Sequence, residues 1–146
     1  MKTNATIDYY IKSCWHGINR MYNLHATEYD ITMTHAYVLL NIDKNGTPAT
    51  KIAPALGLEI RSLTRTLKTL EEKKWIRKEI DTNDRRIVKI FLTKEGIENR
   101  NLAKKKVILF NEMIINKISP EKIAVFLEVI NEIDAIVAKN SDKSKF

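Results

Sequence analysis

The chain has 146 residues, 44% of them hydrophobic and 29% charged, which is the length and composition of one globular domain. A net charge of +7 favours a polyanionic partner. The single cysteine excludes a disulfide framework and a cysteine-rich zinc site. No run approaches the roughly 20 apolar residues that cross a bilayer, and the beginning of the chain has no apolar signal core, so we expect a cytoplasmic protein without a membrane partner.

Helical periodicity dominates the first half of the chain. Apolar residues spaced by three and four predict a first helix over about residues 6–28. A second helix is predicted from an N-cap at Thr32 to about Asp43, and Asn45-Gly46 closes it with a turn.

A third, short helix is predicted before Gly57. Thr47-Pro48 is expected to open it, with threonine as N-cap and proline at the first helical position. Gly57 is expected to end it, because glycine adopts the left-handed conformation that often follows a helix.

The next predicted helix, residues 60–73, is amphipathic and basic. Ile60, Leu63, Leu67 and Leu70 share one face and are expected to hold the helix on the core. The opposite face carries Arg61, Ser62, Thr64, Arg65, Lys68 and Thr69. Two short helices joined this closely, with the second one basic, indicate a helix-turn-helix.

A β-hairpin is predicted directly after the basic helix. In the run 76–80 the two isoleucines and Lys78 alternate with Arg77 and Glu79, and in the run 88–92 aliphatic residues alternate with Lys89 and Phe91. The polar segment Asp81–Arg86 lies between the two runs. Between Arg61 and Lys89 there are ten Lys or Arg against five acids, which is +5. A basic helix beside a basic hairpin is typical of a winged helix-turn-helix that holds duplex DNA.

Two helices complete the predicted fold, which is mainly α with a small hairpin wing. Thr93 is expected to cap a helix over about 94–117. Ser119-Pro120-Glu121 is expected to start the last helix, which runs to about Ala138 before a frayed tail at 139–146. The apolar residues of the first helix and of these two exceed the needs of the winged unit, so we expect them to form a homodimer body. The alternative is that they complete the core of a monomer.

The polar faces suggest how DNA would be read. Arginine contacts guanine bidentately and Ser or Thr contacts either type of pair, so Arg61, Ser62, Thr64 and Arg65 are expected to read bases in the major groove. Lys68 and Thr69 are expected to contact phosphates. The alternative for each is an ordinary solvated helix face.

Residues of about 31–96 resemble the MarR (multiple antibiotic resistance regulator) family of winged-helix transcription factors. The resemblance depends on an ordered set of short segments, namely Ile31–Thr34, Leu56–Leu58, Ser62–Arg65, Leu70–Lys73, Asp81–Arg86 and Leu92–Gly96.

The resemblance implies a homodimeric, ligand-responsive regulator, more often a repressor than an activator, on a pseudo-palindromic operator. It makes residues 1–146 one domain, with a DNA-binding unit at about 31–93 and dimerisation helices at about 6–28 and 94–138. It places Arg86 in the minor groove, with Asp84 positioned to orient it and Arg85 as a neighbouring cation. We expect a salt bridge with Asp84 to hold Arg86 for this insertion, and the alternative is that Arg86 makes this bridge and no contact with DNA.

Three residues depart from the family pattern. Asn83 replaces a frequent arginine in the wing, and Lys74 replaces the glycine that usually ends the recognition helix, so that end is expected to be made differently. Pro54 lacks the backbone N–H that would bond to Thr50, so the third helix is expected to be kinked or partly 3₁₀.

The signal is expected outside the DNA-binding unit. The resemblance places a small aromatic or phenolic effector near Trp15, His16, Arg20, His35 and Tyr37, although for each residue taken alone a core or interface role is the more common one.

Cys14 is a candidate redox sensor by analogy with one branch of the family, in which nearby tyrosines form hydrogen bonds with a cysteine of the first helix. Tyr22, Tyr29 and Tyr37 are candidates here, but a lone cysteine on an apolar face more commonly lies in a core.

Other classes of function find little support in the sequence. The three histidines lack metal-ligand spacing, so no metal site and no cofactor are expected. Motifs for catalysis and phosphate-binding loops are missing, so an enzyme is not expected. The remaining rivals are a winged-helix protein-interaction module without specific DNA contact, and a redox or metal sensor on the same scaffold.

Overall fold

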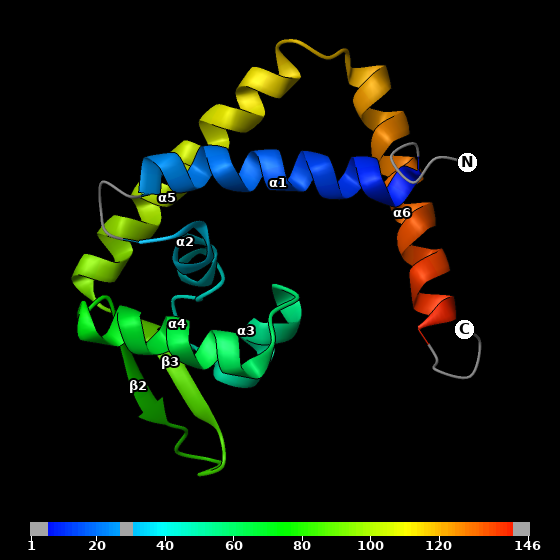
Figure 1. Cartoon of the computed structure of the whole chain (residues 1–146). Coiled ribbons are helices and arrows are strands. Elements are labelled where there is room, and N and C mark those ends of the chain that lie inside the picture. Colours follow the sequence, from blue (N-terminus) through cyan, green and yellow to red (C-terminus); the bar gives the residue numbers. More distant parts are fainter. Residues whose placement is uncertain (1–5, 27–30, 142–146) are drawn as a thin grey trace. The chain divides into compact units, whose positions relative to one another are not determined.

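The computed structural model describes residues 6–26 and 31–141, and it confirms a mainly helical fold with a small sheet (Figure 1). The described residues form two compact units, divided after Lys104. The elements in order are α1 (Ile7–Ala26), α2 (Met33–Leu40), β1 (Thr47–Pro48), α3 (Ala49–Ala55), α4 (Ile60–Glu72), β2 (Ile76–Ile80), β3 (Val88–Leu92), α5 (Lys94–Ile115) and α6 (Pro120–Asn140).

The predicted hairpin is confirmed with its predicted bounds. Strands β2 and β3 pair antiparallel, with Ile76 opposite Leu92 and Ile80 opposite Val88. The sheet also has a third strand that the sequence did not predict, and the strand order is β1-β3-β2.

The third strand corrects the interpretation of Thr47-Pro48, which form β1 and do not open a helix. Thr47 pairs with Ile90 of β3, and its hydroxyl accepts a hydrogen bond from the Asp43 amide at 2.8 Å. The threonine side chain therefore closes the preceding turn and is not available as an N-cap. Pro48 occupies the N-cap position of α3.

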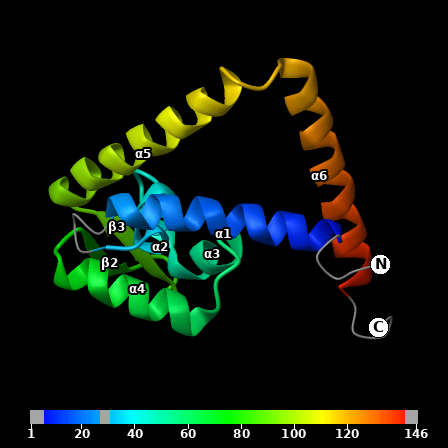
Figure 2. The same ribbon diagram turned by 45° about the horizontal axis from the view of Figure 1, so that its top comes forward.

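The core of the first unit lies where α2, α3 and α4 meet the sheet. In both ribbon views α2 lies between α1 and α4, and helices α2, α3 and α4 gather near the base of the wing (Figures 1 and 2). The buried cluster consists of Val38, Leu39, Ile42, Ile52, Ala53, Leu63, Leu67, Leu70, Ile76 and Ile90. Local apolar periodicity thus predicted most of the residues that hold the helix-turn-helix together.

The predicted burial is wrong for one residue of the apolar face of α4. Leu63, Leu67 and Leu70 are buried, but Ile60 is 78% exposed. Thr66 takes a buried place instead, and its hydroxyl donates to the Ser62 carbonyl at 3.0 Å. That bond satisfies the polar atom inside the core, so burial of the threonine leaves no unpaired donor.

Helices α3 and α4 end in the same hydrogen-bonding motif. After α3, Gly57 adopts φ +60° and the Leu58 amide donates to the Ala53 carbonyl at 2.9 Å. After α4, Lys74 adopts φ +59° and the Trp75 amide donates to the Leu70 carbonyl at 2.9 Å. Both ends are Schellman motifs. The expectation that Lys74 requires a different helix end is wrong, since lysine takes the left-handed conformation itself.

Pro54 is accommodated near the end of α3. It is the sixth residue of a seven-residue α-helix. The next bonds include an i to i−3 contact from the Gly57 amide to the Pro54 carbonyl at 3.2 Å. The 3₁₀ character therefore follows the proline in the closing turn, and α3 itself is assigned as α-helix.

The start of α5 is fixed by a predicted cap. The Thr93 hydroxyl accepts from the Gly96 amide at 3.0 Å and donates to the Lys74 carbonyl at 2.7 Å. The Thr93 amide donates to the Trp75 carbonyl at 3.0 Å. A Cβ atom on Gly96 would lie well inside 3.0 Å of that carbonyl, so only glycine allows this approach.

The remaining boundaries differ from the predictions by a few residues. Helix α2 ends at Leu40 and α5 at Ile115, before the predicted 43 and 117, whereas α6 continues to Asn140. At the end of α2 the Asn41 amide donates to the Tyr37 and Val38 carbonyls, both at 3.1 Å, and the Asn41 side chain donates to the Tyr37 carbonyl at 2.9 Å. Residues 27–30 and 142–146, which include Tyr29 and most of the predicted tail, lie outside the described residues.

The second unit, from Lys105 onward, consists of the end of α5 and all of α6. None of the 21 residues of α6 is buried. The large hydrophobic side chains exposed in this unit are Ile108, Leu109, Met113, Ile115, Ile118, Val125, Phe126, Leu127, Val129, Ile136 and Val137. Burying such a surface is favourable at roughly 25 cal/mol per Å².

We expect Lys74→Gly to stabilise the fold by about 0.5–1 kcal/mol, because glycine adopts φ near +60° without the steric cost that a Cβ imposes. The midpoint of urea unfolding, at one fixed protein concentration, measures the change. Lys73→Gly is the matched control: Lys73 has φ −74°, so this change is expected to destabilise. A lower midpoint for Lys74→Gly would contradict the account of this helix end.

Candidate nucleic-acid interface

The polar face of α4 is open to solvent. Arg61, Ser62, Thr64, Arg65 and Lys68 are exposed. Thr69, the sixth predicted residue of this face, is half-buried, and its hydroxyl donates to the Arg65 carbonyl at 3.3 Å. The structure therefore brings five of the six predicted residues onto one accessible surface.

The arginines of this face keep their charge uncompensated. Neither Arg61 nor Arg65 forms an ion pair with any residue in the described part of the chain. Lys68 lies 3.8 Å from Glu72, and both side chains are more than 60% exposed, so this pair contributes little. Glu71 contacts Lys78 at 2.5 Å and links the end of α4 to β2.

Asp81 organises the tip of the wing. Its carboxylate accepts the backbone amides of Asn83 at 2.8 Å and Asp84 at 3.0 Å, and it pairs with Lys89 of β3. The Lys89 ammonium and these amides lower the pKa of Asp81 to about 2. The carboxylate is therefore ionised at neutral pH, and one residue fixes both the turn and the base of the tip. The sequence interpretation missed this role, although an aspartate commonly accepts the backbone amide two residues further on in a turn.

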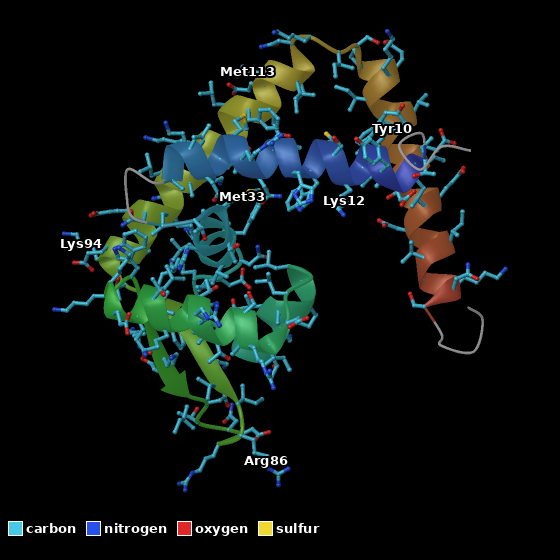
Figure 3. The ribbon with its side chains drawn as sticks, in the orientation of Figure 1. Tyr10, Lys12, Met33, Arg86, Lys94 and Met113 are labelled. Atoms are coloured by element: carbon cyan, nitrogen blue, oxygen red, sulfur yellow. The ribbon has the colours of Figure 1, made fainter. Side chains whose placement is uncertain are left out.

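Asp84 positions Arg86 differently from the prediction. Its carboxylate accepts the Arg86 backbone amide at 3.0 Å, and no ion pair joins the two side chains in the described structure. Arg85 and Arg86 are exposed. Arg86 lies at the far end of the wing, and its side chain points away from the helices (Figure 3). The aspartate thus shapes the turn while the guanidinium stays available.

The base of the wing carries a further cation. The Arg77 guanidinium lies 4.6 Å from the centre of the Phe91 ring and pairs with Glu79. A Cβ atom on Gly46 would lie within 3.0 Å of the same ring, so the turn before β1 packs closely on β3. These contacts hold Arg77, which makes it a structural cation and not part of the free charge.

A cavity of about 320 Å³ lies within the first unit. Trp15 and Tyr37, two of the predicted effector residues, line it, and their rings stack with centres 6.2 Å apart. The other lining residues are Asn19, Thr34, Ala55, Leu56 and Leu58. Sequence reasoning missed these, although Asn19 and Thr34 lie one helical turn from Trp15 and Tyr37.

The other predicted effector residues do not line this cavity. His16 and Arg20 are exposed on α1. His35 acts at the start of α2, where its Nδ1 accepts the Thr32 amide at 3.1 Å and lies 2.8 Å from the Thr32 hydroxyl. Burial raises the pKa of Tyr37, and burial together with Tyr37 raises the pKa of Tyr22. Both tyrosines are therefore neutral donors at physiological pH.

The cysteine and histidines form no chemical centre in the described part of the chain. Cys14 is exposed on α1, so within one chain it is not the core residue that its apolar surroundings suggested. No group of three or more His, Cys, Asp or Glu among the described residues has the geometry of a metal site. No described helix is long and apolar enough to cross a membrane.

Comparison with solved structures identifies the same fold. The S. aureus MepR–DNA complex matches with a TM-score of 0.81 and 21% identity, over 89% of this chain and 97% of that one. Streptococcus pneumoniae FabT in complex with DNA matches with a TM-score of 0.76 and 23% identity, over 91% of this chain and 96% of FabT. The transcriptional regulator SlyA matches with a TM-score of 0.83 and 19% identity, over 93% of this chain and 96% of SlyA.

Comparison at the level of sequence adds a family and a relative. Residues 31–88 match the model of the MarR family. The HTH-type transcriptional regulator SarZ of Staphylococcus aureus (strain USA300) is 30% identical over 129 residues, which cover 87% of this chain and 83% of SarZ. With the basic helix, the projecting wing and this identity over more than four fifths of both proteins, the chain belongs to the MarR family of DNA-binding transcriptional regulators.

Proposed function

We propose that this regulator is a homodimeric repressor that binds a pseudo-palindromic operator and releases it when a small ligand binds. The observation that carries the proposal is that one unit presents free arginines on two elements. Arg61 and Arg65 on α4 form no ion pair with any described residue. Arg85 and Arg86 are exposed at the wing tip. Free cations on a helix beside a β-ribbon match the two grooves of a duplex.

Each polar residue of α4 has a proposed contact. Arg61, Ser62, Thr64 and Arg65 would face base edges in the major groove, where arginine recognises guanine. Lys68 and Thr69, further along the helix, would contact phosphates. Solved structures of the relatives MepR and FabT are complexes with DNA, which supports the same partner here.

The wing would reach the neighbouring minor groove. Arg86 is exposed at the tip, and the bonds of Asp81 and Asp84 hold the turn that carries it. A narrow minor groove has a strongly negative potential that attracts arginine. Because both aspartates are engaged by backbone amides, their charges are directed into the turn while those of the arginines face outward.

A second copy of the chain is the proposed partner of the exposed apolar surface. In the second unit all of α6 lacks burial, and its large hydrophobic side chains are exposed. In the first unit α1 exposes Ile7, Tyr10 and Leu24 at 67%, 63% and 74%. A two-fold dimer would bury both surfaces and present two recognition helices to the two halves of an operator.

The cavity is the proposed site of the signal. Stacked aromatic rings and apolar side chains suit a small aromatic ligand, while Asn19 and Thr34 offer hydrogen bonds. Leu56 and Leu58 belong to the turn that leads into α4. A ligand that fits only one position of this turn would shift the population of DNA-binding dimers.

Arg86→Ala is expected to lower operator affinity at least tenfold without unfolding the chain, because it removes the exposed cation at the wing tip. Binding to the intergenic sequence upstream of the chain's own gene is measured by gel shift at one salt concentration. Lys122→Ala on α6 is the matched control, since it removes one exposed charge that belongs neither to α4 nor to the wing.

The same assay separates regulator from interaction module. Specific binding should weaken steeply with salt and stay far tighter than binding to unrelated duplex. Equal affinity of Arg86→Ala and the unaltered chain would refute the role of the wing, and equal affinity for operator and unrelated DNA would favour the protein-interaction module.

Phe126→Glu is expected to convert the dimer to a monomer, because it buries a charge in the proposed apolar interface. Sedimentation equilibrium should give the mass of one chain. Ala124→Glu is the matched control: Ala124 is exposed two residues earlier, on the opposite side of α6. A monomeric mass for the unaltered protein would refute the dimer.

Trp15→Ala is expected to raise, by about tenfold, the concentration of a small phenol needed to release operator DNA, because the stacking surface of the cavity is lost. A panel of phenols is screened first on the unaltered protein by fluorescence anisotropy of labelled DNA. His16→Ala changes the neighbouring residue outside the cavity and should release DNA as before.

Oxidation of Cys14 is the competing signal, and the same assay tests it. Peroxide should release DNA equally from the unaltered protein and from Cys14→Ser if the cavity is the only sensor. Loss of peroxide release in Cys14→Ser, with no phenol effective, would replace the ligand mechanism with a redox mechanism.

A further inference from the structure

Ile60 is an apolar side chain where the pattern of α4 calls for burial. It is the first residue of the helix and 78% exposed, and no other large hydrophobic side chain among the described residues is more exposed. The residues that follow it in the apolar stripe, Leu63 and Leu67, are at most 5% exposed. Ile60 therefore contributes little to the core and leaves its side chain to solvent.

Thr64 extends this apolar spot along the same side of the helix. It lies one turn beyond Ile60, so the two side chains are neighbours on the helix surface. The Thr64 hydroxyl donates its proton to the Ile60 carbonyl at 2.9 Å. The proton is thus used within the helix, and Thr64 offers an approaching molecule its methyl group and acceptor lone pairs.

The charges around the spot indicate which part of a duplex it would meet. Glu59 is exposed directly before Ile60, and no ion pair compensates its carboxylate in the described structure. A carboxylate repels phosphates, so this end of α4 favours base edges over the backbone. Arg61, Arg65 and Lys68 supply the attraction to the duplex from the adjoining face of the helix.

Within the major groove, the thymine 5-methyl is the apolar group that matches such a spot. Resting on the proposed binding of α4 to DNA, we infer that Ile60 and the Thr64 methyl group select a thymine in each half-site by contact with its 5-methyl group. Ile60 is thereby a specificity-determining residue, and the arginines supply the affinity and the other base contacts.

The experiment begins with selection of a preferred sequence from a pool of random DNA duplexes by the full-length protein. Each thymine of the selected duplex is then replaced in turn by deoxyuridine, which removes the 5-methyl group and keeps every hydrogen-bonding atom. At one thymine per half-site, we expect the replacement to weaken binding about fourfold, the value of one buried methyl-sized group.

The variants Ile60→Ala and Thr64→Ser assign that methyl contact to its protein side. On the thymine duplex each should bind about threefold to fivefold more weakly than the unaltered chain. On the deoxyuridine duplex Ile60→Ala should lose almost nothing further, because the contact is already gone. Ile97→Ala, an exposed isoleucine on α5, is the matched control and should retain the full preference for thymine.

Several results would overturn the assignment. Ile60 does not read the methyl group if replacement by deoxyuridine weakens binding equally at every thymine. The same holds if Ile60→Ala retains the preference for thymine over deoxyuridine. If Ile60→Ala becomes monomeric in sedimentation, its side chain belongs to a contact between copies. A pool that yields no enriched sequence would refute the proposed DNA-binding function itself, which distinguishes that failure from this one.

Discussion

The junction between α4, the wing and α5 is the constraint on which the DNA-binding unit depends. Lys74 turns the chain with φ +59°, and its carbonyl accepts the Thr93 hydroxyl at 2.7 Å. The Trp75 carbonyl accepts the Thr93 amide at 3.0 Å, at a place where only the missing side chain of Gly96 allows α5 to approach. The end of the recognition helix, the start of β2, the end of β3 and the start of α5 therefore meet at four residues. As a result, α4 and the wing are held in one fixed relation, as the proposed contact with two grooves requires.

The two aspartates of the wing tip likewise fix the backbone around them. Asp81 contacts two backbone amides and Lys89, and Asp84 contacts the Arg86 amide. Both carboxylates stabilise the turn from inside, which lets a short, exposed loop carry two arginines without pairing their guanidinium groups. The low pKa of Asp81, about 2, keeps this arrangement charged throughout the physiological range. The two aspartates thus order the tip, while Arg85 and Arg86 supply its positive charge.

Periodicity predicted the elements well and the exceptions poorly, for physical reasons. Runs of five alternating residues gave β2 and β3 their bounds, and the leucines of α4 gave the buried stripe. Strand β1 has only two residues, too few for any period to register, and its pairing with β3 joins positions about 40 residues apart. Ile60 has the right spacing but lies at the first position of its helix, beyond the core. The cavity is lined by side chains from α1, α2, the last residue of α3 and the turn after it, a juxtaposition that only tertiary packing creates.

The two ends of α4 are held by different kinds of contact, and this difference suggests where a signal would act. The C-terminal end is closed by a Schellman motif and by the hydrogen bonds of Thr93. The N-terminal end follows Leu56 and Leu58, which line the cavity, and its N-cap Glu59 makes no side-chain capping bond. A ligand in the cavity would therefore displace the end of α4 that carries Ile60 and Arg61 more readily than the end joined to the wing. In the proposed binding mode the first turns of the helix read the bases, so a small displacement there would abolish recognition while leaving the fold intact.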